Sequence, residues 1–286
     1  MSREHLTDAL KTMAREAGAD LVGIADIGRF DGVDSRHHPA SIFPETRSVI
    51  VLGKRIVRGC LRGVEEGTHM SAMDIYALNW VPDRFLAQVT VTVGSWLEDQ
   101  RFEAVPLPYL PVEIPPMGVA VQTDRPRPNV TVDFDDAAVR AGLGALGATG
   151  MLMTPQYGHR QVLQLILTDA ELVPDPVSDF NPCADCRACA EACPLNAIRE
   201  RHAVRILDRE YQVAAMDRDL CARCANGARK NRYHPSAAPH RLGARCMRAC
   251  LTALEGVTEN RFALPFRRRP AWRIGPSGVP ELETTR

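Results

Sequence analysis

The stretch CADCRACAEACP at residues 183–194 carries four cysteines with the spacing C-x2-C-x2-C-x3-C-P. In bacterial proteins that hold 4Fe–4S clusters, this spacing places three thiolates on one tight loop around a cluster, and the cysteine before the proline binds another cluster. A zinc site is the alternative interpretation, but zinc usually takes two separated C-x2-C pairs. The run therefore predicts an iron–sulfur site and, with it, a second cluster.

The thiolates for a second cluster are available downstream. Two 4Fe–4S clusters take eight thiolates, and the chain has nine cysteines. The predicted ligands of the first cluster are Cys183, Cys186, Cys189 and Cys250, and those of the second are Cys193, Cys221, Cys224 and Cys246. One cluster with four spare thiols is the alternative. We expect the ninth, Cys60, to be a small buried apolar residue.

Length, composition and charge exclude several classes of protein. A chain of 286 residues can bury a sizeable core. Apolar residues make up 45% and charged residues 24%, and the formal net charge is zero, so no global field favours nucleic acid or membrane. No apolar run approaches the ~18 residues of a membrane span, and the N-terminus shows neither an apolar core nor twin arginines. We therefore expect a cytoplasmic protein whose cysteines bind metal and do not form disulfides.

Hydrophobic periodicity predicts helices and strands that alternate in the first part of the chain. Apolar residues recur at helical steps over 2–17, and the long run 75–100 fits one helical face better than the strand-like alternation of QVTVTV within it. A further helix is predicted around 135–142, and strands are predicted at 21–27, 48–53, 103–108 and 161–169. This order predicts an α/β (α+β) sandwich.

The sequence divides into three predicted parts. Residues 1–172 form the α/β body, which would bind cofactor and substrate. The Pro-rich VPDPVSDFNP at 173–182 interrupts the periodicity and opens a cysteine-bearing, helical module at 173–256. Residues 257–286 have many Pro and Gly and predict an irregular tail.

Longer matches accompany the cysteine run. AAVRAGLGALGATGMLMTPQYGHR at 137–160 and ILTDAEL at 166–172, followed by that run, resemble the epoxyqueuosine reductase and reductive dehalogenase superfamily. The resemblance implies a nitroreductase-like α/β body that docks a ferredoxin-like module with two 4Fe–4S clusters. Members with known chemistry use a base-off cobalamin, whose cobalt is reduced through the nearer cluster. Cobalamin is thus an expected cofactor by resemblance alone.

The chain departs from the family pattern in three ways. Gly243 stands where the first cysteine of the later group belongs, and Leu251 replaces a proline, so Cys224 is interpreted as a relocated ligand beside the lone Cys221. We expect no helical-repeat extension of the kind that the tRNA-modifying enzymes carry, which argues against tRNA specificity. We likewise expect neither the twin-arginine signal nor the long N-terminal region of respiratory dehalogenases.

Three residues are predicted to be catalytic from the resemblance. An Asp shortly before the AGLG turn donates the proton in epoxyqueuosine reductase-like sequences, and Asp133 and Asp136 are the matches in VDFDD. The alternative is that Asp135 or Asp136 caps the following helix. Tyr76 lies where the family has a Tyr facing the cofactor pocket, and burial in the core is its alternative.

A glycine run fits a nucleotide-binding motif by letter only. Gly142, Gly144 and Gly147 read G-x-G-x-x-G, but a dinucleotide site needs a strand directly before the run, and a helical segment precedes this one. Glycines permit close approach of the backbone, so a cofactor or cluster edge packing against this turn is one interpretation. Tight packing of helix on strand is the other.

These observations predict an oxidoreductase. Electrons from a low-potential donor of the ferredoxin or flavodoxin type would pass through two 4Fe–4S clusters to a cobalamin that reductively transforms a small organic substrate. An electron-transfer or corrinoid-reducing carrier without its own substrate is the rival hypothesis. Epoxyqueuosine-type tRNA modification is a third, although we do not expect nucleic acid or a membrane as partner.

Overall fold

The structure is a computed structural model of the chain. It describes residues 2–66, 69, 71–109, 122–224, 228–229, 240–241, 244–266, 272–274, 277 and 280–282. Gly243 lies outside the described residues.

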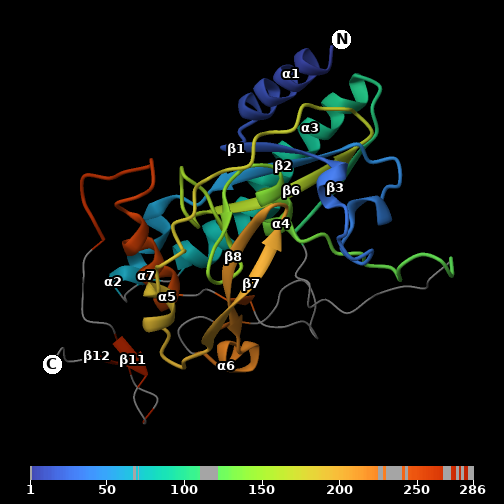
Figure 1. Cartoon of the computed structure of the whole chain (residues 1–286). Helices are drawn as coiled ribbons and strands as arrows, with labels where there is room; N and C mark the ends of the chain where they lie inside the picture. The colour runs from blue at the N-terminus through green and yellow to red at the C-terminus, as the bar shows by residue number, and fades with distance from the viewer. Residues whose placement is uncertain are drawn as a thin grey trace.

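A four-stranded sheet forms the centre of the body, and every pairing in it is antiparallel. Its order is β1 (Leu21–Asp26), β2 (Ser48–Arg55), β6 (Gln161–Thr168) and β3 (Ala104–Leu107). The first six residues of β2 are all buried, because both faces of the sheet are covered. The strands predicted at these four places are confirmed, and the body is a mixed α and β structure (Figure 1).

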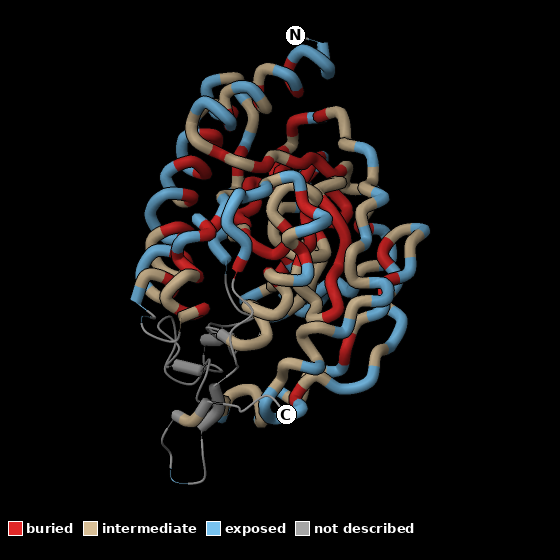
Figure 2. The backbone as a smooth tube through the Cα atoms, turned by 90° about the vertical axis from the view of Figure 1, so that its left-hand side faces the viewer, coloured by how far each residue is buried: buried red, intermediate tan, exposed pale blue. Residues whose placement is uncertain are grey.

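Alternate residues of β2 serve two different cores, as the period of a strand requires. Ile50 and Leu52 pack with α1 (Arg3–Glu16) and α3 (Ala87–Asp99) on one face. Val49 and Val51 pack on the other face with α4 (Phe134–Arg140) and the short strands β4 (Ala145–Leu146) and β5 (Leu152–Met153). Figure 2 shows the buried stretches gathered at the centre of the molecule.

The run predicted as helix at 75–100 is helical throughout. It consists of η4 (Ala72–Leu86), with wide π-type turns and Pro82 inside it, and of α3, which continues it without a break. Leu86, Val89, Val93 and Leu97 form its buried stripe. The helical spacing of these residues therefore predicted the structure correctly, whereas the strand-like alternation of QVTVTV did not. Among the described residues, no helix is long and apolar enough to cross a bilayer.

The cysteine-bearing part is not wholly helical, so that prediction is wrong. It contains α5 (Ala188–Glu191), α6 (Arg218–Ala222) and α7 (Ala244–Leu254), but also an antiparallel hairpin of β7 (Ile198–Ile206) and β8 (Arg209–Met216). Most of β7 is not buried, so its sequence lacks the alternation that marks a half-buried strand. Ile206 and Tyr211, at the turn end of the hairpin, join the body core.

The connection between the two parts is tied to the body at Asp175. Its carboxylate accepts hydrogen bonds from Lys11 Nζ at 2.5 Å and from the N–H of Ile24 at 2.9 Å. Pro176 packs directly on Gly142. The segment predicted to separate the two parts is therefore held against the body by these contacts. The domain boundary at residue 172 stays a prediction.

The remaining elements are short. They are η1 (Ile27–Phe30), η2 (Pro39–Ser41), η3 (Arg58–Leu61), α2 (Arg62–Glu66), β9 (Ala228–Arg229), β10 (His240–Arg241), β11 (Trp272–Ile274) and β12 (Pro280–Leu282). β9 pairs with β10, and β11 pairs with β12, both antiparallel. The last pair corrects the prediction of an irregular tail for those residues.

Candidate iron–sulfur centres and the adjoining acids

The cysteine run lies on a loop that leads into and out of α5. Cys183 and Cys186 precede the helix, Cys189 lies in it, and Cys193 follows it. The N–H of Ala197 donates a hydrogen bond of 3.2 Å to the Cys193 sulfur. Backbone donors of this kind stabilise a thiolate, which is the form that binds metal.

Two more cysteines are carried by α7, which contacts α5. Cys246 and Cys250 are four residues apart, so they lie one turn apart on the same side of the helix. Cys221 lies in α6 and Cys224 just beyond it. All nine cysteines are free thiols.

The electrostatics of the two α7 thiols show which cysteines surround each of them. Burial raises the pKa of Cys250, and the nearby thiols of Cys183, Cys189 and Cys186 raise it further, with Cys246 contributing least. Negative charge on one sulfur makes charge on its neighbour unfavourable. The main neighbours of Cys250 are thus Cys183, Cys186 and Cys189.

Cys246 has a different set of neighbours. Burial raises its pKa to about 12, with added effects from Cys193, Cys221 and Cys224. The structure therefore brings eight thiols into two groups of four, which we call the first thiol group, around Cys250, and the second thiol group, around Cys246. These are the two sets named from the sequence, and their binding of clusters stays a prediction.

Four thiols and no other ligand type are the donor set that 4Fe–4S clusters take. Among the described residues, no three His, Cys, Asp or Glu side chains are grouped closely enough to hold a single metal ion. The donor type of both thiol groups, thiol sulfur alone, is the type that a 4Fe–4S cluster takes. Cys60, the ninth cysteine, is 9% exposed in an apolar cluster with Leu61 and Val64, as expected for a structural thiol.

The first thiol group adjoins the body at the glycine turn. Burial raises the pKa of Cys183, while a hydrogen bond from the backbone of Ala148 and the charge of Arg201 oppose that rise. Ala148 directly follows Gly147, and its carbonyl accepts from the N–H of Ala214 in β8 at 2.8 Å. The turn thus contacts both the cysteine loop and the hairpin.

The glycines themselves are required by tight packing within the protein. Gly142 has φ +78°, and a Cβ there would lie 2.2 Å from the Pro176 carbonyl oxygen. A Cβ on Gly144 would lie 1.9 Å from the Met153 oxygen, and one on Gly147 would lie 2.6 Å from the end of the Met153 side chain. Protein atoms already fill these positions, which agrees with tight packing as a role of the three glycines, and cofactor binding by this turn stays a prediction. A helix, α4, precedes the turn, as the argument against a dinucleotide site expected.

The acids of VDFDD make three different sets of contacts, and a catalytic role for Asp133 or Asp136 stays a prediction. Asp133 is the N-cap of α4 and accepts from the N–H groups of Asp135 and Asp136, both at 3.0 Å. The prediction that Asp135 or Asp136 would cap is wrong, because the helix begins one residue earlier, at Phe134. Asp136 forms an ion pair with Arg140 at 2.5 Å, and burial, opposed by Arg140, raises its pKa.

Asp135 is the titratable acid that the sequence argument did not select. It accepts a hydrogen bond of 2.7 Å from the N–H of Leu152 in β5. Burial, together with the charge of Asp133, raises its pKa to about 7. The only feature of the sequence that pointed to Asp135 was its position in the first turn of a predicted helix.

Tyr76 lies at the surface, so burial in the core, the alternative raised for it, is wrong. It is 49% exposed and meets Trp80 edge-on, with ring centroids 5.2 Å apart. Arg84 stacks over the other ring of this pair, at 4.8 Å from the Trp80 centroid. A catalytic role for Tyr76 stays a prediction.

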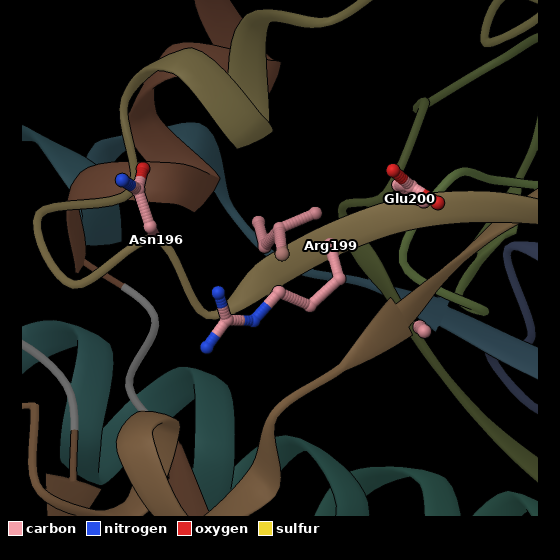
Figure 3. A pocket seen from close by; sticks show the side chains of 5 residues that line it. Asn196, Arg199 and Glu200 are labelled. Atoms are coloured by element: carbon pink, nitrogen blue, oxygen red, sulfur yellow. The ribbon is translucent and has the colours of Figure 1, made fainter.

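A hollow of about 610 Å³ lies at the base of the β7–β8 hairpin. It is lined by Asn196, Ile198, Arg199, Glu200 and Ala215, and Figure 3 shows Arg199 extending from the hairpin toward the loop that carries Asn196. Arg199 pairs with Asp217 at 3.0 Å, and Asp217 caps α6 by accepting from the N–H of Leu220. One of its lining residues, Arg199, is thus linked through Asp217 to the helix that carries Cys221.

Comparison with known proteins bears on this site. No family model matches the chain. The tetrachloroethene reductive dehalogenase of Desulfitobacterium hafniense is 40% identical over 76 residues, which are 26% of this chain and 14% of the relative. The epoxyqueuosine reductase of a Synechococcus strain is 27% identical over 222 residues, which are 68% of this chain and 61% of the relative. Both of these relatives of the chain are reductases. The resemblance seen in the sequence is thereby confirmed.

A solved structure shares the fold across most of the chain. A catabolic reductive dehalogenase aligns with a TM-score of 0.61 at 17% identity, covering 91% of this chain and 33% of that one. This chain thus spans only part of the length of the relatives that it matches. An epoxyqueuosine reductase solved with a tRNA stem loop aligns at a TM-score of 0.44, over 68% of this chain and 52% of that one. Our expectation that nucleic acid is not a partner stays a prediction.

Proposed function

We propose that the protein is an iron–sulfur oxidoreductase that passes electrons through two 4Fe–4S clusters, held by a ferredoxin-like module on a nitroreductase-like body. One observation carries the proposal: the eight thiols fall into two groups of four around Cys246 and Cys250. Each cluster would take one thiolate from α7 and three from the segments in and around α5 and α6. Because one helix supplies a ligand to each, the two clusters are neighbours and electrons can pass between them.

The surroundings of the two thiol groups suggest a direction for electron flow. Neither α5 nor α6 has a buried residue, so the order of the two clusters is proposed from their contacts with the body. The first thiol group adjoins the body through Ala148. We propose that a low-potential donor of the ferredoxin or flavodoxin type delivers electrons to the second cluster. The first cluster then passes them to an acceptor in the body.

The acceptor expected from the resemblance is a cobalamin, which would supply a reducible cobalt. Reduction of a small organic substrate also takes up a proton, and a donor works best when its pKa lies near the working pH. Asp133 caps a helix and Asp136 is paired with Arg140, so both serve best as carboxylates. Asp135, with a pKa of about 7, can hold and release a proton at neutral pH.

Anaerobic reconstitution of the full chain tests the proposal. We expect about eight irons per chain, two interacting paramagnetic signals after reduction, and a spectral change when cobalamin is added to the reduced protein. About four irons would reject the second cluster. Eight irons with no response to cobalamin or to any organic acceptor would favour the carrier hypothesis, and retention of a tRNA stem loop would favour RNA modification.

A pair of variants makes the iron count specific. Cys246→Ser should lose the second cluster, since it removes the only ligand that α7 gives to the second thiol group. Cys60→Ala removes a thiol buried among apolar side chains and should keep all the iron. Equal iron contents in the two variants would contradict the proposed ligand sets.

A further inference from the structure

One arginine of the hairpin holds the loop of the first thiol group. Arg201 lies in β7, paired with Ala214 of β8. Its guanidinium donates hydrogen bonds to the carbonyl oxygens of Cys183 at 2.9 Å and Ala184 at 3.0 Å, and its other terminal nitrogen donates to the carbonyl of Cys186. A single side chain thus reaches three carbonyls between two predicted cluster ligands.

These carbonyls have no partner from regular structure, because residues 183–186 lie outside every helix and strand. Polar backbone groups in such a loop need donors from elsewhere to hold one conformation. A planar guanidinium suits this task, since its fork of donors spans neighbouring acceptors in a fixed geometry. Arg201 therefore limits the positions that Cys183 and Cys186 can take.

The same side chain also brings a permanent positive charge to the first thiol group. The guanidinium stays protonated at all accessible pH values, and the bonds to Cys183 and Cys186 are partly buried, where solvent screens charge less. A cluster that accepts one electron gains one negative charge. A fixed cation beside it favours the reduced form.

We propose that Arg201 is a positioning residue for the first cluster, which holds the Cys183–Cys186 loop in its ligating geometry and raises the reduction potential of that cluster. The inference rests on the proposed function, because it requires the first thiol group to hold a cluster. The step concerned is the transfer of one electron from the donor, by way of the second cluster, to the first. No bond forms or breaks in it.

The matched variants are Arg201→Gln and Arg205→Gln. Arg205 lies on the same strand four residues on, is exposed, and donates to the carbonyl of Leu207 at 3.3 Å. Both variants remove one positive charge from β7. The full chain of each is reconstituted anaerobically and titrated with a low-potential chemical reductant, and paramagnetic resonance follows the two clusters separately.

In Arg201→Gln, we expect the ratio of reduced to oxidised first cluster at a fixed potential to fall about tenfold, a shift of ~59 mV for a one-electron couple. The second cluster should keep its potential, and Arg205→Gln should keep both. Arg201→Lys retains the charge without the fork, so it should keep most of the potential but lose iron from the first cluster faster under a chelator.

Failures of the inference and of the proposed function are distinguishable. Wild-type protein that takes up no iron would overturn the proposed function itself. Wild-type protein with about eight irons, beside an Arg201→Gln variant with unchanged potentials and chelation rate, would overturn only the role of Arg201. If Arg201→Gln cannot be loaded, the Arg201→Lys variant decides: a chelation rate equal to wild type would contradict the loop-holding role.

Discussion

The body and the cysteine module are stabilised by different means. In the body, both faces of β2 are covered and its first six residues are buried. In the module, α5 and α6 contain no buried residue, and β7 has only Ile206. Apolar burial is the main source of stability in folded domains, so the module depends on other contacts. The contacts that stabilise the module are those of the thiol groups, its own hydrogen bonds, and its ion pairs with the body.

Removal of iron should separate the two regions most strongly. Structural metal sites supply much of the folding free energy of small metal-binding modules. Chelation of the reconstituted protein should therefore leave β2 and β6 protected from hydrogen exchange, while amides of α5, α6 and α7 exchange rapidly. Equal loss of protection in the sheet and in these helices would contradict the division.

Truncation of a sheet residue tests the opposite side of the comparison. Leu52 is fully buried between β1, β6 and the helices, and Leu52→Ala should lower the free energy of unfolding by about 2–5 kcal/mol. Val91 on α3 is 57% exposed, so Val91→Ala should change the free energy of unfolding by less than ~0.5 kcal/mol. Chemical denaturation followed by tryptophan fluorescence measures the free energy of unfolding of both variants. The iron content of the folded fraction should not change.

Breaking the contact between the regions should have a smaller effect on the body and a clear effect on the clusters. Glu65 of α2 has no exposed side-chain surface and accepts from both Arg248 Nε and, at 3.2 Å, Arg248 Nη2. Removing one partner of a buried pair costs about 3–5 kcal/mol, so Glu65→Ala should release α7 and speed the loss of iron. Asp34→Ala breaks the exposed pair with Arg36 and is the control, with no change in iron release.

The smallest predicted effect is a pH dependence that arises in the body alone. The pKa of Asp135 is raised from 3.8 to about 7, so the folded state binds more protons than the unfolded state between these values. Its contribution to stability is therefore present at low pH and is lost as pH rises toward 7. Asp135→Asn keeps an acceptor for the N–H of Leu152 and should flatten this slope, measured as denaturation midpoints from pH 4 to 8.

The sequence predicted the body well because its signals are local. The stripe of Leu86, Val89, Val93 and Leu97 identified the long helical run, and the apolar run of β2 identified a strand. The hairpin of β7 and β8 was not predicted because its few buried residues, Ile206, Tyr211 and Ala214, do not alternate regularly with exposed ones. The capping role of Asp133 depended on a helix start that periodicity places only to within a few residues.

The composition of the two thiol groups followed from counting cysteines, and the structure brings the same residues together. The contacts of Arg201 could not be predicted in this way. They join residues 15 to 18 positions apart through a hairpin that the sequence did not reveal. Interactions between a side chain and loop carbonyls carry no pattern of residue types. They emerge only from the folded backbone.

The placement of Cys246 and Cys250 on one short helix has a consequence for assembly. A rigid helix cannot rotate to favour one sulfur without displacing the other, and Arg248, between the two, fixes that rotation against Glu65. Binding of a cluster at one thiol group thus holds the other α7 cysteine in the position from which it would bind the second cluster. Loading should be cooperative, so a preparation given half its iron should contain mainly full and empty molecules.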